Sequence, residues 1–272
     1  MYYFNKPKVI PVIDKSLDIT KALAIDYNFT EFGSQRTRDA VAKSLGTFGN
    51  TPTWARSYYG YGVDFDANNE YIQTENLVKS QQSSGQITVE IIGTRDSGGS
   101  GTGYGAMVFK KNATTDTAGR VWNIENDNAD AGWGVAFQWW FSSQLGIWSI
   151  PYPTAGSVVH WILRYNSAST SNDPTWWQNG KPLTVTERIT PSGTARTDGS
   201  FIYLGNNSPS FNSGWDGKLF LVRVWNRMLS DSEAYKLYAD PNHIYKKGYV
   251  VGKAPAVVGT TYPGYYGGQG YF

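Results

Sequence analysis

The sequence predicts an all-β protein, a two-sheet jelly-roll sandwich with one short C-terminal helix and extended arms at both ends. Short segments of alternating apolar and polar residues recur along the chain, and 30 glycines help to separate them. This spacing is typical of strands joined by turns. One hairpin and one helix carry signals strong enough to be placed individually.

Alternation of period two marks the strands, because successive side chains of a strand point to opposite faces. Residues 23–29 alternate in this way and predict a half-buried strand. In residues 133–141 every odd-numbered position is apolar and forms a core face, whereas Trp140 is the one large ring on the opposite face. Residues 33–60 are polar and predict a long surface excursion, and further strands are expected at residues 62–72, 86–94, 158–165, 201–205 and 218–225.

The hairpin and the helix lie in the second half of the chain. Asn179 and Gly180 separate two β-rich runs, and this dipeptide is a strong hairpin signal because both turn residues need a positive φ. Ser230 and Glu233 have the spacing of a capping box at a helix start. The helix is expected over residues 231–238, ended by the following Asp-Pro pair.

The segment Gly214–Tyr238 resembles the closing strand and helix of laminin-G-like domains in the concanavalin A-like lectin/glucanase superfamily. Gly62–Ile72, Val158–Tyr165 and Trp176–Gly180 resemble further segments of that family and follow in the expected order. The resemblance covers about residues 18–240. It implies a two-sheet jelly roll, often with a role in binding carbohydrate or protein.

One departure from the family pattern concerns the closing strand. Members of the family usually carry an acidic pair where this chain has Phe220 and Leu221. Apolar bulk in place of exposed charge suggests that this patch is covered. Two explanations stay open: either residue faces a partner protein, or a β-bulge turns both of them inward.

The resemblance also suggests a biological setting. The exit from the helix through residues 238–245 is similar to that of laminin-G-like proteins of bacteriophage particles. The N-terminus lacks a secretory signal and the chain has no cysteine, which agrees with synthesis in a host cytoplasm. The leading expectation is a non-enzymatic virion structural protein, such as a capsid decoration protein, whose partners are other virion proteins and further copies of itself.

The chain divides into an N-terminal arm at residues 1–16, a laminin-G-like sandwich at 17–245 and a C-terminal arm at 246–272. The C-terminal arm is rich in glycine and tyrosine, a composition more typical of linkers than of folded domains. We expect both arms to dock on neighbouring subunits. The expected assembly contacts are Tyr249, Tyr262, Tyr265, Tyr266 and Phe272.

Charge and hydropathy argue against two classes of partner. The net charge is only +2, from 24 basic and 22 acidic residues, and the chain has no basic run, so no nucleic-acid partner is expected. No apolar stretch approaches the roughly 18 residues of a membrane helix, so no membrane partner is expected either.

Few residues of this chain match the patterns of known catalytic sites. Asp64, Asp66 and Glu70 are the nearest approach to the carboxylate motif of glucanases, but the spacing does not match and a structural role is expected. The two histidines, His160 and His243, have no nucleophile motif beside them. A glycoside hydrolase is therefore a remote alternative, and the chain is expected not to be an enzyme.

No cofactor is expected, with one weak candidate for calcium. Ca²⁺ takes six to eight oxygen ligands, and Glu125, Asp127 and Asp130 supply several carboxylate oxygens within a short stretch. A solvated polar turn explains the same residues.

The aromatic content favours a contact surface, because 11 Trp and 19 Tyr exceed what a core of this size needs. Sugars stack on exposed rings, and protein partners use rings as anchors. The alternative function is therefore a free carbohydrate-binding module, and a host-surface glycan is a further partner of the virion protein. Packing of these rings within the protein is the other explanation for their number. The candidate contacts are Trp140, Trp176, Trp177, Tyr58 and Tyr59, with Phe220 and Leu221.

Overall fold

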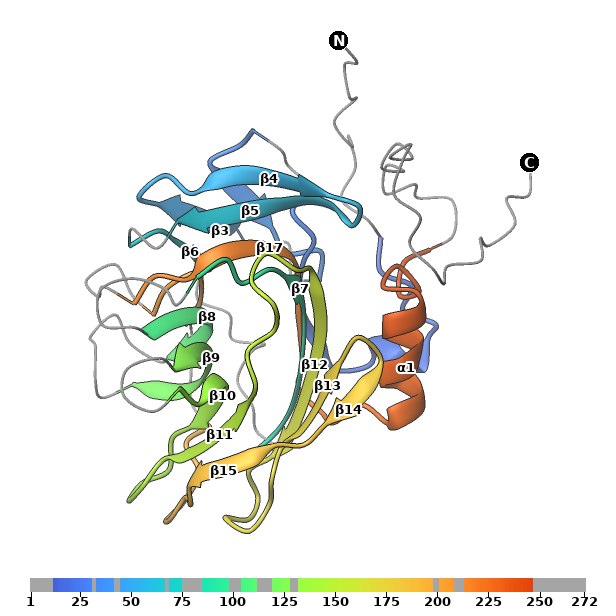
Figure 1. Cartoon of the computed structure of the whole chain (residues 1–272). Helices are drawn as coiled ribbons and strands as arrows, with labels where there is room; N and C mark the ends of the chain where they lie inside the picture. The colour runs from blue at the N-terminus through green and yellow to red at the C-terminus, as the bar shows by residue number, and fades with distance from the viewer. Residues whose placement is uncertain are drawn as a thin grey trace.

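The computed structural model is an antiparallel β-sandwich with one helix (Figure 1). The two sheets face each other across the core, and the helix lies on the outer side of one of them. The sandwich and the short C-terminal helix predicted from the sequence are confirmed. The structure describes residues 12–30, 33–41, 45–66, 69–74, 85–97, 104–111, 119–127, 132–197, 201–207 and 213–246.

The first sheet has eight strands within the described residues, in the order β14-β13-β12-β7-β17-β5-β4, and β1 also pairs with β17. All its strand pairs are antiparallel. Its strands are β1 Leu23–Tyr27, β4 Thr53–Ser57, β5 Gly60–Asp66, β7 Gln86–Gly93, β12 Val159–Asn166, β13 Thr175–Gln178, β14 Lys181–Leu183 and β17 Asp216–Trp225.

The second sheet has nine strands within the same residues, in the order β15-β11-β10-β9-β8-β16-β6-β3-β2. Its strand pairs are likewise antiparallel. Its strands are β2 Arg36–Arg38, β3 Leu45–Gly49, β6 Tyr71–Thr74, β8 Tyr104–Lys111, β9 Arg120–Asp127, β10 Gly134–Trp139, β11 Gly146–Ile150, β15 Thr186–Ile189 and β16 Phe201–Leu204.

The core between the sheets is largely aromatic. Tyr165 of β12 lies among Phe137, Trp139 and Trp148 of the opposite sheet, with ring centroids 5.0–5.4 Å away. Ring pairs at this separation add to the stabilisation that their buried area provides. The predicted core face of residues 133–141 is confirmed at Val135, Phe137, Trp139 and Phe141, which are all buried.

The local signals of the hairpin and the helix are confirmed. Asn179 and Gly180 have φ angles of 51° and 75°, as a tight turn between β13 and β14 requires. The helix α1 spans Asp231–Ala239, one residue longer than expected, and both hydrogen bonds of the capping box between Ser230 and Glu233 are present.

The surface excursion predicted for residues 33–60 is wrong, because it contains β2, β3 and β4 and the start of β5. β2 and β4 are edge strands, and edge strands are often short and polar and so carry little hydrophobic alternation. The single strand region expected at residues 62–72 is two strands, β5 and β6, which belong to different sheets.

Besides β2, β3 and β4, the strands β8, β9, β11 and β15 were not predicted. Register shifts interrupt β8 at two places, and a bulge removes the period-two pattern by which a strand is found in a sequence. All five residues of β11 are buried, so this strand has no polar face to alternate with. β1 is likewise buried on both faces rather than half-buried.

A third layer covers the outer side of the eight-stranded sheet. It consists of α1, the 3-10 turn Asp18–Thr20 and the neighbouring segments, and apolar residues such as Ile19, Leu237 and Ile244 pack there against Ile162 and Trp225. No helix within the described residues is long and apolar enough to cross a bilayer.

Part of the expected N-terminal arm is built into this layer. The backbone N–H of Lys246 donates to the carbonyl of Val12 at 2.9 Å, and that of Asp14 donates to Ile244 at 2.8 Å. Residues 12–16 therefore lie against the segment that leaves α1. Residues 1–11 and 247–272, with all five expected assembly contacts, lie outside the described residues.

A buried ionic network joins the sheet to this layer. Arg223 of β17 donates to Asp26 of β1 and to Glu90 of β7, each at 2.9 Å, and to the hydroxyl of Tyr245 at 2.8 Å. The imidazole of His160 lies 2.8 Å from the other oxygen of Glu90. Burial opposes ionisation of Glu90, yet Arg223 and His160 hold the pKa of this carboxyl below its usual value.

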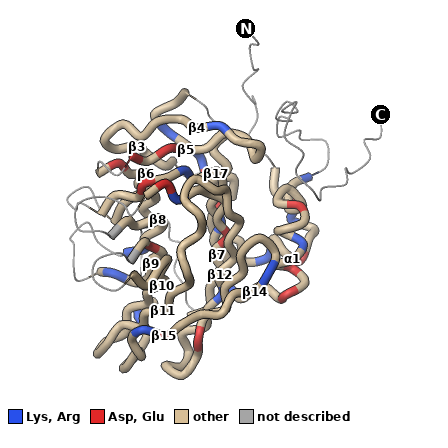
Figure 2. The backbone as a smooth tube through the Cα atoms, in the orientation of Figure 1, with Lys and Arg blue, Asp and Glu red and all other residues tan. Residues whose placement is uncertain are grey.

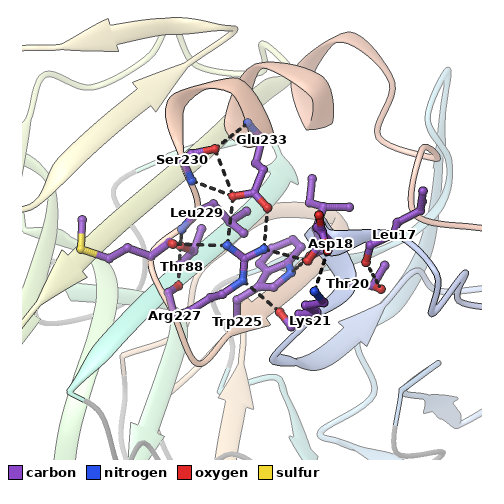
Figure 3. Close-up of polar contacts among 12 residues, drawn as sticks. Leu17, Asp18, Thr20, Lys21, Thr88, Trp225, Arg227, Leu229, Ser230 and Glu233 are labelled. Atoms are coloured by element: carbon purple, nitrogen blue, oxygen red, sulfur yellow. Dashed lines mark hydrogen bonds and ion pairs between the residues drawn. The ribbon is translucent and has the colours of Figure 1, made fainter.

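Arg227 anchors the start of α1 to the 3-10 turn (Figure 3). Its guanidinium donates to both carboxylate oxygens of Glu233, at 2.9 and 2.6 Å. It also donates to the backbone carbonyls of Lys21 at 3.0 Å and Asp18 at 3.1 Å. Glu233 thus caps the start of α1 and, through Arg227, also connects the helix to the 3-10 turn of the third layer.

Replacing Arg223 with alanine is expected to lower the free energy of unfolding by about 3–5 kcal/mol, because two buried carboxylates lose their cation. Urea unfolding of both proteins measures this loss. The control is Lys21→Ala, which removes the exposed pair with Asp18 and is expected to cost about 0–1 kcal/mol. Equal losses for the two variants would contradict the role given to the network.

The Arg227–Glu233 pair predicts a pH dependence. The hydrogen bonds from Arg227 lower the pKa of Glu233 from 4.5 to about 2. A lowered pKa stabilises the fold above the ordinary value, and this contribution is lost as the pH falls towards 2. The difference in unfolding free energy between wild type and Glu233→Gln is therefore expected to shrink over that range. Urea unfolding at a series of pH values measures it, and a constant difference would contradict the assignment.

Candidate functional site

The alternation of β13 sends its paired rings to opposite sides of the eight-stranded sheet. Trp176 lies opposite Leu163 and belongs to the core, with 1% of its surface exposed. Trp177 lies opposite Ile162 on the outer side and is half-buried. One of the two rings points away from the core, as the sequence predicts. Trp176 is corrected from a surface ring to a core ring that lines the hollow beside Trp177.

An open hollow of about 380 Å³ lies beside Trp177, at the edge where the chain passes between the sheets. β14 and β15 follow each other in sequence but belong to different sheets, and Figure 1 shows them along the lower edge of the sandwich. The first residue of α1 completes the wall. The lining residues are Arg164, Asp173, Pro174, Thr175, Trp176, Trp177, Pro182, Leu183, Val185 and Asp231.

Arg164 is the one cation in this lining, and it contacts neighbouring groups of the protein. Its guanidinium pairs with Asp231 at 2.6 Å and donates to the carbonyl of Leu229 at 2.8 Å and to the hydroxyl of Thr175 at 3.0 Å. It also lies 5.7 Å from the ring centroid of Trp177. Arg164 therefore holds the wall of the hollow together, and its charge is already paired with a carboxylate.

Asp173 is an exposed polar group of the lining, and it accepts the indole N–H of Trp148 at 2.8 Å. The core behind it holds two donors without a hydrogen-bond partner, the indole N–H of Trp176 and the hydroxyl of Tyr165. Burial raises the pKa of Tyr165, and the carboxylates of Asp173 and Glu187 raise it further. Both donors are closed to solvent, so a ligand in the hollow would bond to exposed groups such as Asp173 and Thr175 instead.

Charge does not dominate this part of the surface. Figure 2 shows basic and acidic residues scattered over both sheets and α1. Binding in the hollow therefore has to use the ring of Trp177 and the exposed hydrogen-bonding groups of Asp173 and Thr175. An apolar ring beside a few polar groups is the usual make-up of a small-ligand site.

The second pair of candidate rings lies at another place. Tyr58 and Tyr59 occupy the turn between β4 and β5, and 80% and 39% of their surfaces are exposed. The prediction that they are accessible is confirmed. They do not line the hollow, and their neighbours are tyrosines of α1, which the sequence had not singled out.

Trp140 follows β10 on the outer side of the nine-stranded sheet, away from the core, as predicted. It packs against Phe109 at 6.0 Å between centroids, and the guanidinium of Arg120 lies 5.7 Å from the centroid of its ring. Trp140 is thus half-buried in a small aromatic cluster with Tyr203 rather than presented on an open surface.

Phe220 and Leu221 do not face a partner, because only 3% and 6% of their surfaces are exposed in the single chain. A β-bulge lies between Leu219 and Leu221, as the second explanation supposed. The bulge does not turn these residues into the central core. Instead they form a separate cluster with Ala55 and Ile92, and the ring of Phe220 lies against Gly62.

The candidate catalytic carboxylates have structural partners. Asp64 lies 3.4 Å from the ammonium of Lys218. Glu70 accepts the backbone N–H of Asp66 at 2.9 Å, and burial raises its pKa to about 7. Glu70 is therefore a buried carboxyl that organises a turn, which agrees with the structural role expected.

The histidines do not form a catalytic pair. His160 is buried in the ionic network, as a satisfied structural histidine. His243 lies in the turn after α1, where its backbone N–H donates to Asp240 at 3.0 Å.

Of the three candidate calcium ligands, only Glu125 has a side chain within the described part of the structure. Its carboxylate accepts the amide of Asn123 at 2.6 Å and also that of Gln138. Asp130 and the side chain of Asp127 lie outside the description. Among the described side chains no group of three or more His, Cys, Asp or Glu could hold a metal ion.

Sequence reasoning missed Asp173, Arg164 and Asp231, which complete the hollow around Trp177. They come from the loop before β13, from β12 and from the start of α1, and only the fold brings them together. The one local signal was position, since Asp173 and Pro174 directly precede the strand that carries both tryptophans.

Comparisons of sequence find no relative. No family model matches the chain, and no curated protein matches it. The laminin-G family, the bacteriophage setting and assembly through the arms therefore remain predictions.

Comparisons of structure find lectin-type sandwiches. A sialidase of Trypanosoma rangeli in complex with 2,3-difluorosialic acid matches with a TM-score of 0.60 and 13% identity, covering 83% of this chain and 34% of the sialidase. The binding domain of Paraclostridial Mosquitocidal Protein 1 matches with a TM-score of 0.59 and 14% identity, covering 82% and 53%. The binding domain of Botulinum Neurotoxin DC in complex with SialylT matches with a TM-score of 0.58 and 8% identity, covering 81% and 52%.

These matches show the fold, an antiparallel β-sandwich of two sheets. At such low identity they do not carry over the activity or the ligand of the neighbours. The chain spans between a third and about half of the length of these three neighbours, so it corresponds to one part of each.

Proposed function

We propose that this protein is a carbohydrate-binding module without catalytic activity, and that the glycan binds in the hollow beside Trp177. The observation that carries the proposal is the half-buried indole ring of Trp177 beside the exposed polar groups of Asp173 and Thr175, in a hollow open to solvent. A sugar ring stacks on an aromatic face, and its hydroxyls both donate and accept. The likeness to the binding domains of two toxins supports a binding role.

The charges around the hollow favour an uncharged sugar. Asp173 and Asp231 bring two carboxylates, whereas the single cation Arg164 is already paired with Asp231. A ligand carboxylate would meet like charge without a free guanidinium to receive it. Neutral hydroxyl groups, in contrast, can donate to the exposed carboxylate of Asp173. We therefore infer a neutral glycan as the ligand.

Trp177→Ala and Asp173→Asn are each expected to weaken glycan binding about tenfold, which corresponds to about 1.4 kcal/mol. The first variant removes the stacking ring, and the second exchanges an acceptor oxygen for an amide. A glycan array identifies the ligand, and calorimetric titration measures the affinity. The matched control is Lys181→Ala, in the same hairpin but outside the lining, which should bind as wild type does. Wild-type affinity in both test variants would contradict the site.

Matched pairs of glycans with and without terminal sialic acid test the preference for a neutral ligand. The uncharged member of each pair is expected to bind about tenfold more tightly. Asp231→Asn should narrow this preference, because it leaves the guanidinium of Arg164 without its carboxylate. Tighter binding of the sialylated member to the wild-type protein would contradict the electrostatic argument.

A further inference from the structure

Exposed tyrosines gather at one place on the outer side of the eight-stranded sheet. Tyr58, Tyr235 and Tyr59 expose 80%, 57% and 39% of their surfaces, and they belong to the few large apolar side chains exposed in the described residues. They come from two elements far apart in the sequence, the β4–β5 turn and α1. Figure 1 shows this turn reaching towards the end of α1.

Contacts between the rings make one continuous surface. Tyr58 and Tyr59 lie edge to face at 5.7 Å between centroids, and Tyr235 lies 6.4 Å from Tyr238. Burial raises the pKa of Tyr59, and the nearby phenols of Tyr238 and Tyr58 raise it further. The β4–β5 turn reaches towards the end of α1, which brings the two pairs of rings near each other (Figure 1). We refer to Tyr58, Tyr59, Tyr235 and Tyr238 as the tyrosine strip.

The tyrosine strip and the hollow lie along the same seam, between α1 and the β13–β14 hairpin. Asp231 at the start of α1 lines the hollow, and Tyr238 lies seven residues later, about 10 Å along the helix. The β13–β14 hairpin runs beside α1 and also extends from the hollow to the tyrosine strip. Pro182 lines the hollow, and Gly180 lies directly under the ring of Tyr238, where a Cβ atom would come within 2.3 Å of that ring.

We propose that the tyrosine strip is a second contact region of the same binding site, so that the ligand is an extended oligosaccharide rather than a single sugar. This inference rests on the proposed function of the hollow. One end of the oligosaccharide occupies the hollow, and the chain then follows the seam to the strip, where further sugar rings stack on the tyrosines.

The chemistry of the strip fits the same ligand as the hollow. A tyrosine side chain is an uncharged ring with a hydroxyl group at its edge, so the strip offers stacking faces together with hydrogen-bonding groups. A neutral sugar chain presents apolar faces for stacking and hydroxyls for hydrogen bonds, and both find partners there. Gly180 adds a constraint, since any larger residue would push Tyr238 out of its place.

The test is the dependence of affinity on the length of the glycan. The probes are cello-oligosaccharides, chito-oligosaccharides and oligomers of the neutral glycan selected on the array, each from the monosaccharide to the hexasaccharide. Affinity for the wild-type protein, measured by calorimetric titration, is expected to rise about tenfold over such a series. Tyr58→Ala, Tyr235→Ala and the double variant are expected to lose this rise while binding the monosaccharide as wild type does.

Two comparisons separate this inference from the proposed function. Trp177→Ala is expected to weaken binding at every length, because it acts in the hollow. Tyr71→Ala, a half-buried tyrosine on the other sheet, is expected to keep the full rise with length. Both strip residues are exposed, so their variants should unfold at the wild-type urea concentration.

An unchanged rise in the double variant, or a flat series in the wild type, would overturn the role of the strip and leave the hollow in place. Weaker binding of the monosaccharide by the strip variants would also overturn it, because the strip would then belong to the primary contact. Failure of the wild type to bind any glycan would contradict the proposed function itself.

Discussion

Arg223 sits between two carboxylates in a part of the protein that is closed to water, and the third layer is organised around it. Asp26 and Glu90 come from the two strands that flank β17, and Tyr245 comes from the segment after α1. Each member satisfies the hydrogen-bonding capacity of another, which is the condition under which buried charge is tolerated. The network thereby fixes the distance between the sheet and the segment that holds α1 in place. α1 in turn supplies one wall of the hollow and half of the tyrosine strip.

The sequence could predict those features that depend on neighbouring residues. Asn179 and Gly180 specify a turn by their own conformational preferences, and Ser230 and Glu233 cap a helix three residues apart, so both were predictable. Trp177 was a sound candidate because alternation must place one of two consecutive rings outside. By contrast Arg223 meets Asp26 across 197 positions and Glu90 across 133, and no local pattern contains such a pairing.

Bulges and burial on both faces account for most of the remaining errors. The shifted register of β17 gave Phe220 and Leu221 the same side of the sheet, where alternation would have divided them. A strand such as β11 is covered on two sides and so loses the polar face by which sequence reasoning finds a strand. The hollow could not be predicted from the sequence, for a related reason. Nothing in the sequence around Asp173, Arg164 or Asp231 indicates a binding site. Their function depends on the fold, which brings them together at the edge where the chain passes between the sheets.

The pairing of Val12 with Lys246 has a consequence for how such a module is carried. Residues 12–14 and 244–246 lie side by side, joined by two backbone hydrogen bonds. A domain whose end segments are neighbours can be inserted into a loop of another protein, or permuted, with little disturbance to its host. The described sandwich meets this geometric condition at its third layer.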